Sequence, residues 1–279
     1  MSSKPRRGFV VPIGGAEEKE HHPRILERFA QLCGGRRARL AVIPTASQLK
    51  TTGPTYEHVF HDLCGVERVD VLAYHERRDA ERRDWLEILK KADGVFVTGG
   101  NQMRLTTVLG GTEVAALLRE RNRKDGLHLA GTSAGAAFVS EHMIAGGEEG
   151  PTPHEGMVQL ASGLGVVAKL IVDQHFRQRD RLGRLISAIA AVPQAIGIGL
   201  DEDTAAFIGP DDDLAVVGSG AVTIVDPAEM EFTSIDDAPP HAPISVVNLR
   251  IHVLTEGGHY DLKHRKATRP AAKPESVES

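Results

Sequence analysis

Short runs of β-branched and other apolar residues alternate, through the first half of the chain, with segments whose apolar residues recur every three or four positions. The runs lie at 9–13, 40–43, 69–72, 94–97 and 127–130. The segments between them include the sets Ile25, Phe29 and Leu32; Trp85, Leu86 and Leu89; and Val114, Leu117 and Leu118. The first pattern is typical of buried strands and the second of amphipathic helices. Their alternation predicts an α/β fold, in which helices cover both faces of a mostly parallel sheet.

The pattern changes after about residue 200. Short apolar runs at 204–208, 214–217, 221–225 and 246–254 are separated by turn residues such as those at 210–213. They predict antiparallel strands added to the same domain. From 264 to 279 the chain is rich in Lys, Arg, Pro and Ser and has few apolar residues. We therefore expect one α/β domain over residues 1–263 and a disordered tail over 264–279.

A glycine-rich turn at 131–135 has the most distinctive local chemistry. The strand expected at 127–130 runs into Gly131-Thr132-Ser133-Ala134-Gly135, which is a G-x-S-x-G motif, and an apolar pattern follows in Ala136, Phe138, Val139, Met143 and Ile144. A sharp turn between strand and helix holds its serine under strain and exposes the hydroxyl. The positive end of the following helix can stabilise an oxyanion. A plain Gly/Ala-rich turn is the alternative, but this context favours Ser133 as a nucleophile.

A serine nucleophile needs a base, and the base needs an orienting acid. His175 closes an apolar run and is the candidate base, although any one of the 13 histidines is more often structural. Asp201, Glu202 and Asp203 close a later apolar run. Three adjacent acids usually mark a solvated turn, but one of these could orient the histidine. The order serine, histidine, acid differs from that of the α/β-hydrolases and argues against that superfamily.

Two further features lie near these candidates. A glycine turn at 98–102 follows the strand expected at 94–97, and the amides of Gly100 and Ala134 could together form an oxyanion hole. An ordinary tight turn fits equally well.

Four arginines lie close together in the sequence soon after His175: Arg177, Arg179, Arg181 and Arg184. If this stretch is helical, Arg177, Arg181 and Arg184 share one stripe. A solvated helix face is the usual meaning, but guanidinium groups at this place also suit substrate carboxylates.

Composition excludes several classes of protein. The net charge of −5 over 279 residues argues against general nucleic-acid binding. The two cysteines, Cys33 and Cys64, form no CxxC motif and suit a reducing compartment. There is no signal-peptide pattern and no apolar stretch of about 18 residues, so we expect a cytoplasmic protein without a membrane partner. There is neither an HExxH motif nor a convincing dinucleotide fingerprint, so we expect no metal and no cofactor.

Taken together, these stretches resemble the cyanophycinases, in the serine peptidase family that also includes the aspartyl dipeptidases (dipeptidase E). The resemblance runs from residue 13 to about residue 260. It is carried by 13–17, 43–47, 98–102, 130–136, 142–147, 172–176 and 199–204. The motif at 130–136 is shared with the dipeptidases, whereas Asp-Gln-His-Phe at 173–176 followed by spaced arginines is more specific to cyanophycinases. Arg177 and Asn101 depart from the expected pattern, which could shift substrate preference.

The resemblance implies a Ser133–His175–Glu202 triad, with Glu202 preferred over Asp201 and Asp203, and Gly100 and Ala134 in the oxyanion hole. It implies a homodimer and a flavodoxin-like sheet related to the class I glutamine amidotransferases. It also implies substrate contacts at Gln102, Asp173, Gln174, Arg179, Arg181 and Arg184.

Cyanophycin, the implied substrate, has a poly-aspartate backbone with an arginine on each β-carboxyl group, and cyanophycinases release β-Asp-Arg dipeptides from it. We expect Asp173 to meet the substrate guanidinium and the arginines to meet its carboxylates. Two alternatives stay open. One is an aspartyl dipeptidase of the same family. The other is a flavodoxin-like binding protein without catalytic activity.

Overall fold

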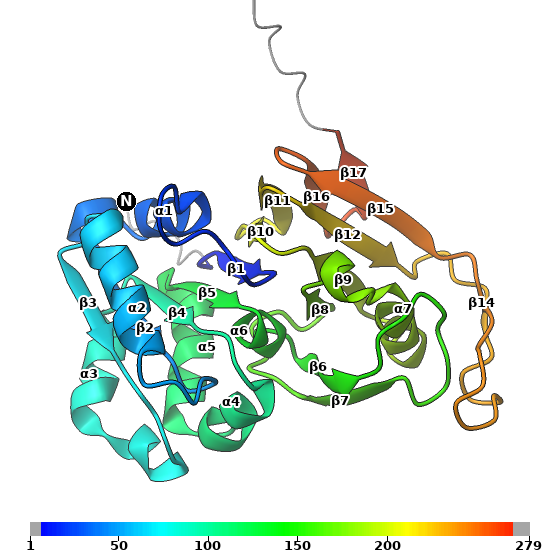
Figure 1. Ribbon diagram of the computed structural model, residues 1–279, viewed down its shortest axis with the longest axis horizontal. Coiled ribbons are helices and arrows are strands. Elements are labelled where there is room, and N and C mark those ends of the chain that lie inside the picture. Colours follow the sequence, from blue (N-terminus) through cyan, green and yellow to red (C-terminus); the bar gives the residue numbers. More distant parts are fainter. Residues whose placement is uncertain (1–6, 270–279) are drawn as a thin grey trace, which may run out of the picture.

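The computed structural model describes residues 7–269 (Figure 1). Its helices are α1 (Arg24–Leu32), α2 (Thr52–His58), α3 (Arg83–Lys91), α4 (Gln102–Leu109), α5 (Glu113–Asp125), α6 (Ala134–Phe138) and α7 (Leu182–Ala191). Its strands are β1 (Val10–Ile13), β2 (Arg39–Ile43), β3 (Arg68–Val71), β4 (Gly94–Val97), β5 (His128–Thr132), β6 (His142–Gly147), β7 (Val158–Ser162), β8 (Leu170–Gln174), β9 (Ile196–Leu200), β10 (Thr204–Ile208), β11 (Asp213–Gly218), β12 (Ala221–Asp226), β13 (Phe232–Thr233), β14 (Val246–Val247), β15 (Arg250–Thr255), β16 (His259–Asp261) and β17 (Lys266–Thr268). No helix among the described residues has the length and apolar character needed to cross a membrane.

The largest sheet within residues 7–269 has nine strands in the order β17-β16-β11-β10-β1-β5-β4-β2-β3. The strands from β1 to β3 in this order are parallel to one another, and those from β10 to β17 pair antiparallel. The parallel part contains all five strands predicted in the first half of the sequence, with ends shifted by a residue or two. The predicted α/β architecture is therefore confirmed in this part of the molecule.

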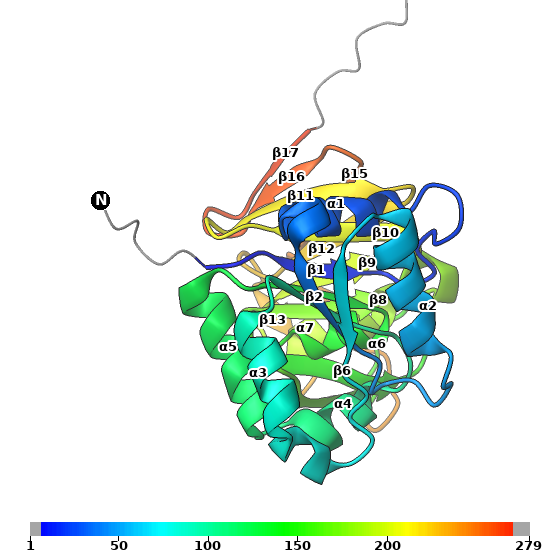
Figure 2. The ribbon, with the colours of Figure 1, turned by 90° about the vertical axis from the view of Figure 1, so that its left-hand side faces the viewer.

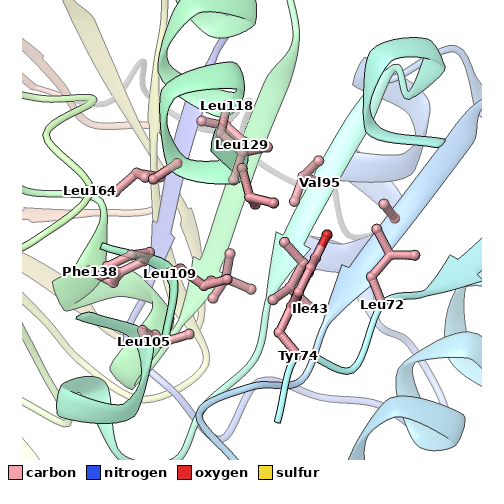
Figure 3. Packing of buried hydrophobic residues seen from close by; sticks show 14 of the residues in the cluster. Ile43, Leu72, Tyr74, Val95, Leu105, Leu109, Leu118, Leu129, Phe138 and Leu164 are labelled. Carbon is pink, nitrogen blue, oxygen red and sulfur yellow. The ribbon is translucent and has the colours of Figure 1, made fainter. Parts of the chain in front are cut away.

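Alternate residues of the parallel strands pack on opposite faces of the sheet, as the two-residue repeat of a strand requires. Val95 and Val97 of β4 face α3 and α5 in one core cluster, where Figure 3 shows Val95 and Leu129 beside Leu118. Phe96 points to the other face, where its ring centroid lies 6.2 Å from that of Phe29 on α1. Figure 2 shows α3 and α5 on one side of these strands and α2 on the other. Helices thus cover both faces, as predicted.

A second sheet, which the sequence did not predict, has the strand order β15-β12-β9-β8. Strands β8 and β9 are parallel, whereas β12 and β15 pair antiparallel. One face packs on α7 and the other on the antiparallel part of the large sheet. The antiparallel strands expected after residue 200 therefore form, but they divide between two sheets. The run predicted as one strand at 246–254 is two strands, β14 and β15.

Two local expectations were wrong. The apolar pattern expected to form one helix after Ser133 ends as a helix at Phe138, and Met143 and Ile144 lie in β6, which pairs with β7 in a hairpin. The strand forms because it pairs with residues 158–162. The spacing of apolar residues after Ser133 cannot reveal this distant partner. The segment at 264–269, expected to be disordered, contains β17, whose backbone pairs with β16 without needing apolar side chains. The rest of the expected tail, 270–279, lies outside the described residues.

Candidate active site

Ser133 occupies a strained turn between β5 and α6. Its backbone has φ 51° and ψ −110°, a region that residues with a Cβ rarely adopt. The Ser133 N–H donates to the Ile13 carbonyl at 2.9 Å, and α6 lies between β5 and β8 near the centre of the molecule (Figure 1). A Cβ on Gly131 would lie 2.3 Å from the Gly135 carbonyl oxygen. Gly131, two residues before the nucleophile, therefore permits a turn that is too tight for a residue with a side chain.

His175 follows β8 and presents its ring to Ser133. Its Nε2 lies 2.9 Å from the Ser133 hydroxyl oxygen. The backbone N–H of His175 donates to the Gly14 carbonyl at 2.8 Å, and this bond connects the end of β8 to the end of β1. A Cβ on Gly15 would lie 2.4 Å from Cε1 of the imidazole, so only a bare glycine backbone leaves room for the ring. The imidazole is thereby held between the nucleophile and the loop after β1.

Glu202 is the one acid of the three candidates that reaches His175. Its Oε1 lies 2.7 Å from Nδ1 of the imidazole. Asp201 instead accepts the N–H groups of Arg177 and Ala221, and Asp203 accepts the N–H group of Glu18. Serine hydroxyl, imidazole and carboxylate thus form a continuous hydrogen-bonded series. A hydroxyl in such a series can pass its proton to the imidazole while the carboxylate orients and stabilises the ring.

The glycine turn after β4 lies against the nucleophile. A Cβ on Gly99 would be 3.2 Å from the Ser133 Cβ. Gly100 has φ 141°, and a Cβ there would be 2.2 Å from the Ala46 carbonyl oxygen. The lack of a side chain on Gly99 favours the close approach to Ser133, and the lack of one on Gly100 lets the turn pack against Ala46. The amide of Gly100 is therefore a candidate to act with that of Ala134, the residue that follows Ser133.

Asp173 and Arg184 are buried and paired with each other. The Asp173 side chain has no exposed surface, and Arg184 donates to both its oxygens, from Nε at 2.7 Å and from a terminal nitrogen at 2.5 Å. In the structure the two side chains bond each other, and contact of Asp173 with a substrate guanidinium and of Arg184 with a substrate carboxylate stays a prediction. A buried charge needs a partner, and here the two charges satisfy one another.

The other predicted substrate contacts differ in accessibility. Arg179 is exposed, on a short 3₁₀ turn that precedes α7. Arg181 is buried and donates to the Gln174 carbonyl at 2.6 Å, and burial lowers the pKa of its guanidinium although Asp173 opposes the shift. Gln102, at the start of α4, donates to the Ala145 carbonyl at 2.7 Å. The stripe of Arg177, Arg181 and Arg184 was expected only if this whole stretch were helical. It does not form, because α7 begins at Leu182.

Comparison with known proteins assigns the family. Residues 10–215 match the model described as "Peptidase family S51". The chain belongs to this peptidase family. It is 45% identical over 257 residues to the cyanophycinase of Trichormus variabilis, covering 92% of this chain and 86% of that protein. It is 41% identical to the cyanophycinase of Geminocystis herdmanii over 267 residues, covering 95% and 97%.

The S51 fold extends to solved structures of low sequence identity. A peptidase from an acI-B1 Actinobacterium superposes with a TM-score of 0.67 at 22% identity and covers 93% of this chain and 98% of that one. At this identity the likeness concerns the fold alone. It supports a mixed α/β fold with a large sheet. The predicted parallel arrangement holds for the five strands from β1 to β3 in the strand order.

Sequence reasoning did not assign a role to the loop after β1. Gly14, Gly15 and Glu17 entered it only as part of a stretch that resembles a known family. In the structure Gly14 and Gly15 touch His175, and Glu17 is almost fully buried. A local signal was present, since a glycine pair directly after an apolar strand indicates close approach of the backbone to another group.

Proposed function

We propose that this S51 peptidase hydrolyses cyanophycin, with Ser133 as nucleophile, His175 as base and Glu202 as the orienting acid. The observation that carries the chemistry is the series of hydrogen bonds from Ser133 Oγ through the imidazole to Glu202, at 2.9 and 2.7 Å. The choice of substrate is supported by relatives named cyanophycinase, which match 92% of the chain at 45% identity.

The reaction follows from the positions of these groups. Ser133 Oγ attacks the carbonyl carbon of a backbone amide while its proton passes to His175 Nε2. The amides of Gly100 and Ala134 stabilise the oxyanion. The imidazolium, stabilised by Glu202, then gives the proton to the leaving amine as the C–N bond breaks, which leaves an ester on Ser133. Water, deprotonated by His175, attacks this ester. The imidazolium returns the proton to Ser133 Oγ as the ester C–O bond breaks, which frees the hydroxyl and releases the carboxylic acid product.

Substrate recognition is proposed to involve Gln102, Gln174, Arg179 and Arg181. Asp173 and Arg184, which the resemblance also implies, bond each other beside them. Two buried polar atoms in this group, Gln174 Oε1 and Arg181 Nε, have no hydrogen-bond partner within residues 7–269. Such atoms are costly unless a ligand satisfies them. Each unit of cyanophycin offers both a carboxylate and a guanidinium, so it can supply an acceptor for arginine and donors for the glutamine oxygen.

Incubation with purified cyanophycin tests the function. We expect mass analysis to find β-Asp-Arg dipeptides as the product. An aspartyl dipeptidase would instead cleave short Asp-Xaa dipeptides and leave the polymer intact. A binding protein without catalytic activity would not react with a fluorophosphonate, whereas we expect labelling that disappears in Ser133→Ala.

Glu202→Gln is expected to reduce turnover of cyanophycin by at least roughly 10²-fold, because the amide neither stabilises the imidazolium nor fixes the ring tautomer as the carboxylate does. Asp203→Asn is the matched control, since Asp203 accepts from the Glu18 N–H and lies outside the proposed triad. Turnover numbers of the two variants check this. A silent Glu202→Gln would remove Glu202 from the triad.

We also infer a flavodoxin-like fold related to the class I glutamine amidotransferases, a homodimer and a cytoplasmic location. Parallel strands covered by helices on both faces, with the proposed nucleophile directly after β5, support the fold relationship. The dimer and the location rest on the resemblance to cyanophycinases and on composition. Light scattering of the purified protein and fractionation of the host cell test them.

A further inference from the structure

Glu17 is a buried acid for which the proposed reaction has no direct use. Only 3% of its surface is exposed. The Tyr56 hydroxyl donates to Oε1, and Thr132 Oγ1 donates to Oε2 at 2.5 Å. Lys19 Nζ lies 3.3 Å from Oε1. Burying a carboxylate is costly unless hydrogen bonds and charges compensate it, and these three groups provide that compensation.

Through the bond from Thr132, Glu17 is connected to the residue directly before the nucleophile. Thr132 is the last residue of β5, and Ser133 follows it in a strained conformation. The Ser133 N–H donates to the Ile13 carbonyl, in the same segment of chain that leads to Glu17. Glu17 and Ile13 therefore hold the nucleophile turn on both sides of the Thr132–Ser133 peptide bond.

The same short segment bonds the backbone of His175 and that of the residue after Glu202. The His175 N–H donates to the Gly14 carbonyl at 2.8 Å, and the Asp203 N–H, next to Glu202, donates to the Gly15 carbonyl at 2.9 Å. Gly15 has φ 97° and Ala16 has φ 48°, so two consecutive residues adopt left-handed backbone. A residue such as Ala16 keeps this conformation only where its surroundings enforce it. The buried bonds of Glu17 come directly after it and supply that constraint.

We propose that Glu17 is a positioning residue of the triad, acting through Thr132 on Ser133 and through the 14–17 loop on His175. The inference rests on the proposed function, because it assumes that Ser133 and His175 react together. Small displacements of a nucleophile reduce turnover strongly even when substrate binding is unchanged. Loss of the Thr132–Glu17 bond should therefore lower kcat and leave KM nearly constant.

The test is the rate at which Ser133 reacts with a fluorophosphonate, together with kcat and KM for cyanophycin. Thr132→Val keeps the shape of the side chain and removes the hydroxyl. We expect it to slow labelling and turnover by roughly 10- to 100-fold with little change in KM. Thr132→Ser restores the hydroxyl and should recover most of both rates. Tyr56→Phe removes the hydroxyl that donates to Glu17 Oε1. Because Tyr56 acts on Ser133 only through Glu17 and Thr132, this variant should slow labelling by a smaller factor.

Tyr260→Phe is the matched control. Tyr260 is a fully buried tyrosine that donates to the buried carboxylate of Asp226 at 2.9 Å, away from the triad. It should lower the melting temperature and keep the wild-type labelling rate. Thr132→Val labelled at the wild-type rate, or Thr132→Ser as slow as Thr132→Val, would overturn the positioning role. If Thr132→Val does not fold, a wild-type rate in Tyr56→Phe overturns it instead. A wild-type protein that does not label would contradict the proposed function itself.

Discussion

Ser133→Ala and His175→Ala are each expected to reduce hydrolysis of cyanophycin by a factor on the order of 10⁴–10⁶ while the fold stays intact. Ser133 supplies the atom that forms the bond to substrate, and His175, at 2.9 Å, supplies the base that makes this atom nucleophilic. Either loss removes the covalent route as a whole. Single-turnover kinetics on cyanophycin measure the effect, and circular dichroism checks the fold.

The double variant should be scarcely slower than either single variant, because the two residues act in one step. Multiplicative losses would mean that Ser133 and His175 do not share a mechanism. His259→Ala is a suitable control. His259 forms a similar pair with Asp213, 2.9 Å between Nδ1 and the carboxylate, on an exposed part of the antiparallel strands. This variant should retain wild-type turnover.

Arg184→Met is expected to lower the free energy of unfolding by about 3–5 kcal/mol, because it leaves the carboxylate of Asp173 buried without its bidentate partner. Both side chains are almost completely shielded from solvent, with exposed fractions of 5% for Arg184 and 0% for Asp173. Arg181 lies 3.6 Å from the same carboxylate and compensates only in part. Denaturant unfolding of the variant and the wild type measures the difference.

Arg177→Met is the control for the loss of a nearby arginine. The Arg177 side chain is 76% exposed and lies 3.5 Å from Asp201, so its removal should change stability by less than about 1 kcal/mol. Asp173→Asn combined with Arg184→Met should regain part of the loss, because no buried carboxylate is then left unpaired. An Arg184→Met variant of wild-type stability that no longer cleaves the polymer would show that Arg184 binds substrate directly.

Local pattern in the sequence was sufficient for the parallel half of the fold. The strands β1 to β5 appear where apolar runs predicted them. For β1, β2, β4 and β5 the reason is that a strand buried on both faces needs nearly every residue apolar, whereas β3 is a half-buried edge strand. The turn around Ser133 was also predictable, since its glycines and its place between strand and helix are features of neighbouring residues. The candidates Ser133, His175 and Gly100 all follow strands that the apolar runs mark.

Other features depended on residues far apart in the sequence. Asp201, Glu202 and Asp203 are adjacent acids, and only the tertiary structure separates the one that reaches His175 from the two that bind backbone amides. Met143 and Ile144 fit a helical spacing, but pairing with β7 decides that they form a strand. Apolar spacing does not specify which distant segment a strand will pair with, and for the same reason it did not reveal the second sheet or β17.

The buried charges show the same division. From the sequence alone, Asp173 and Arg184 are two charged groups suited to a zwitterionic substrate; in the structure each is the partner of the other, eleven positions apart. Glu17 entered the sequence analysis only as part of the stretch at 13–17, yet Thr132, 115 positions away, bonds it in the interior. The sequence by itself determined which residue types and which strand ends were available for chemistry. The tertiary structure decided which charges meet each other and which remain open to substrate, because the cost of burying a charge depends on partners that only folding brings within reach.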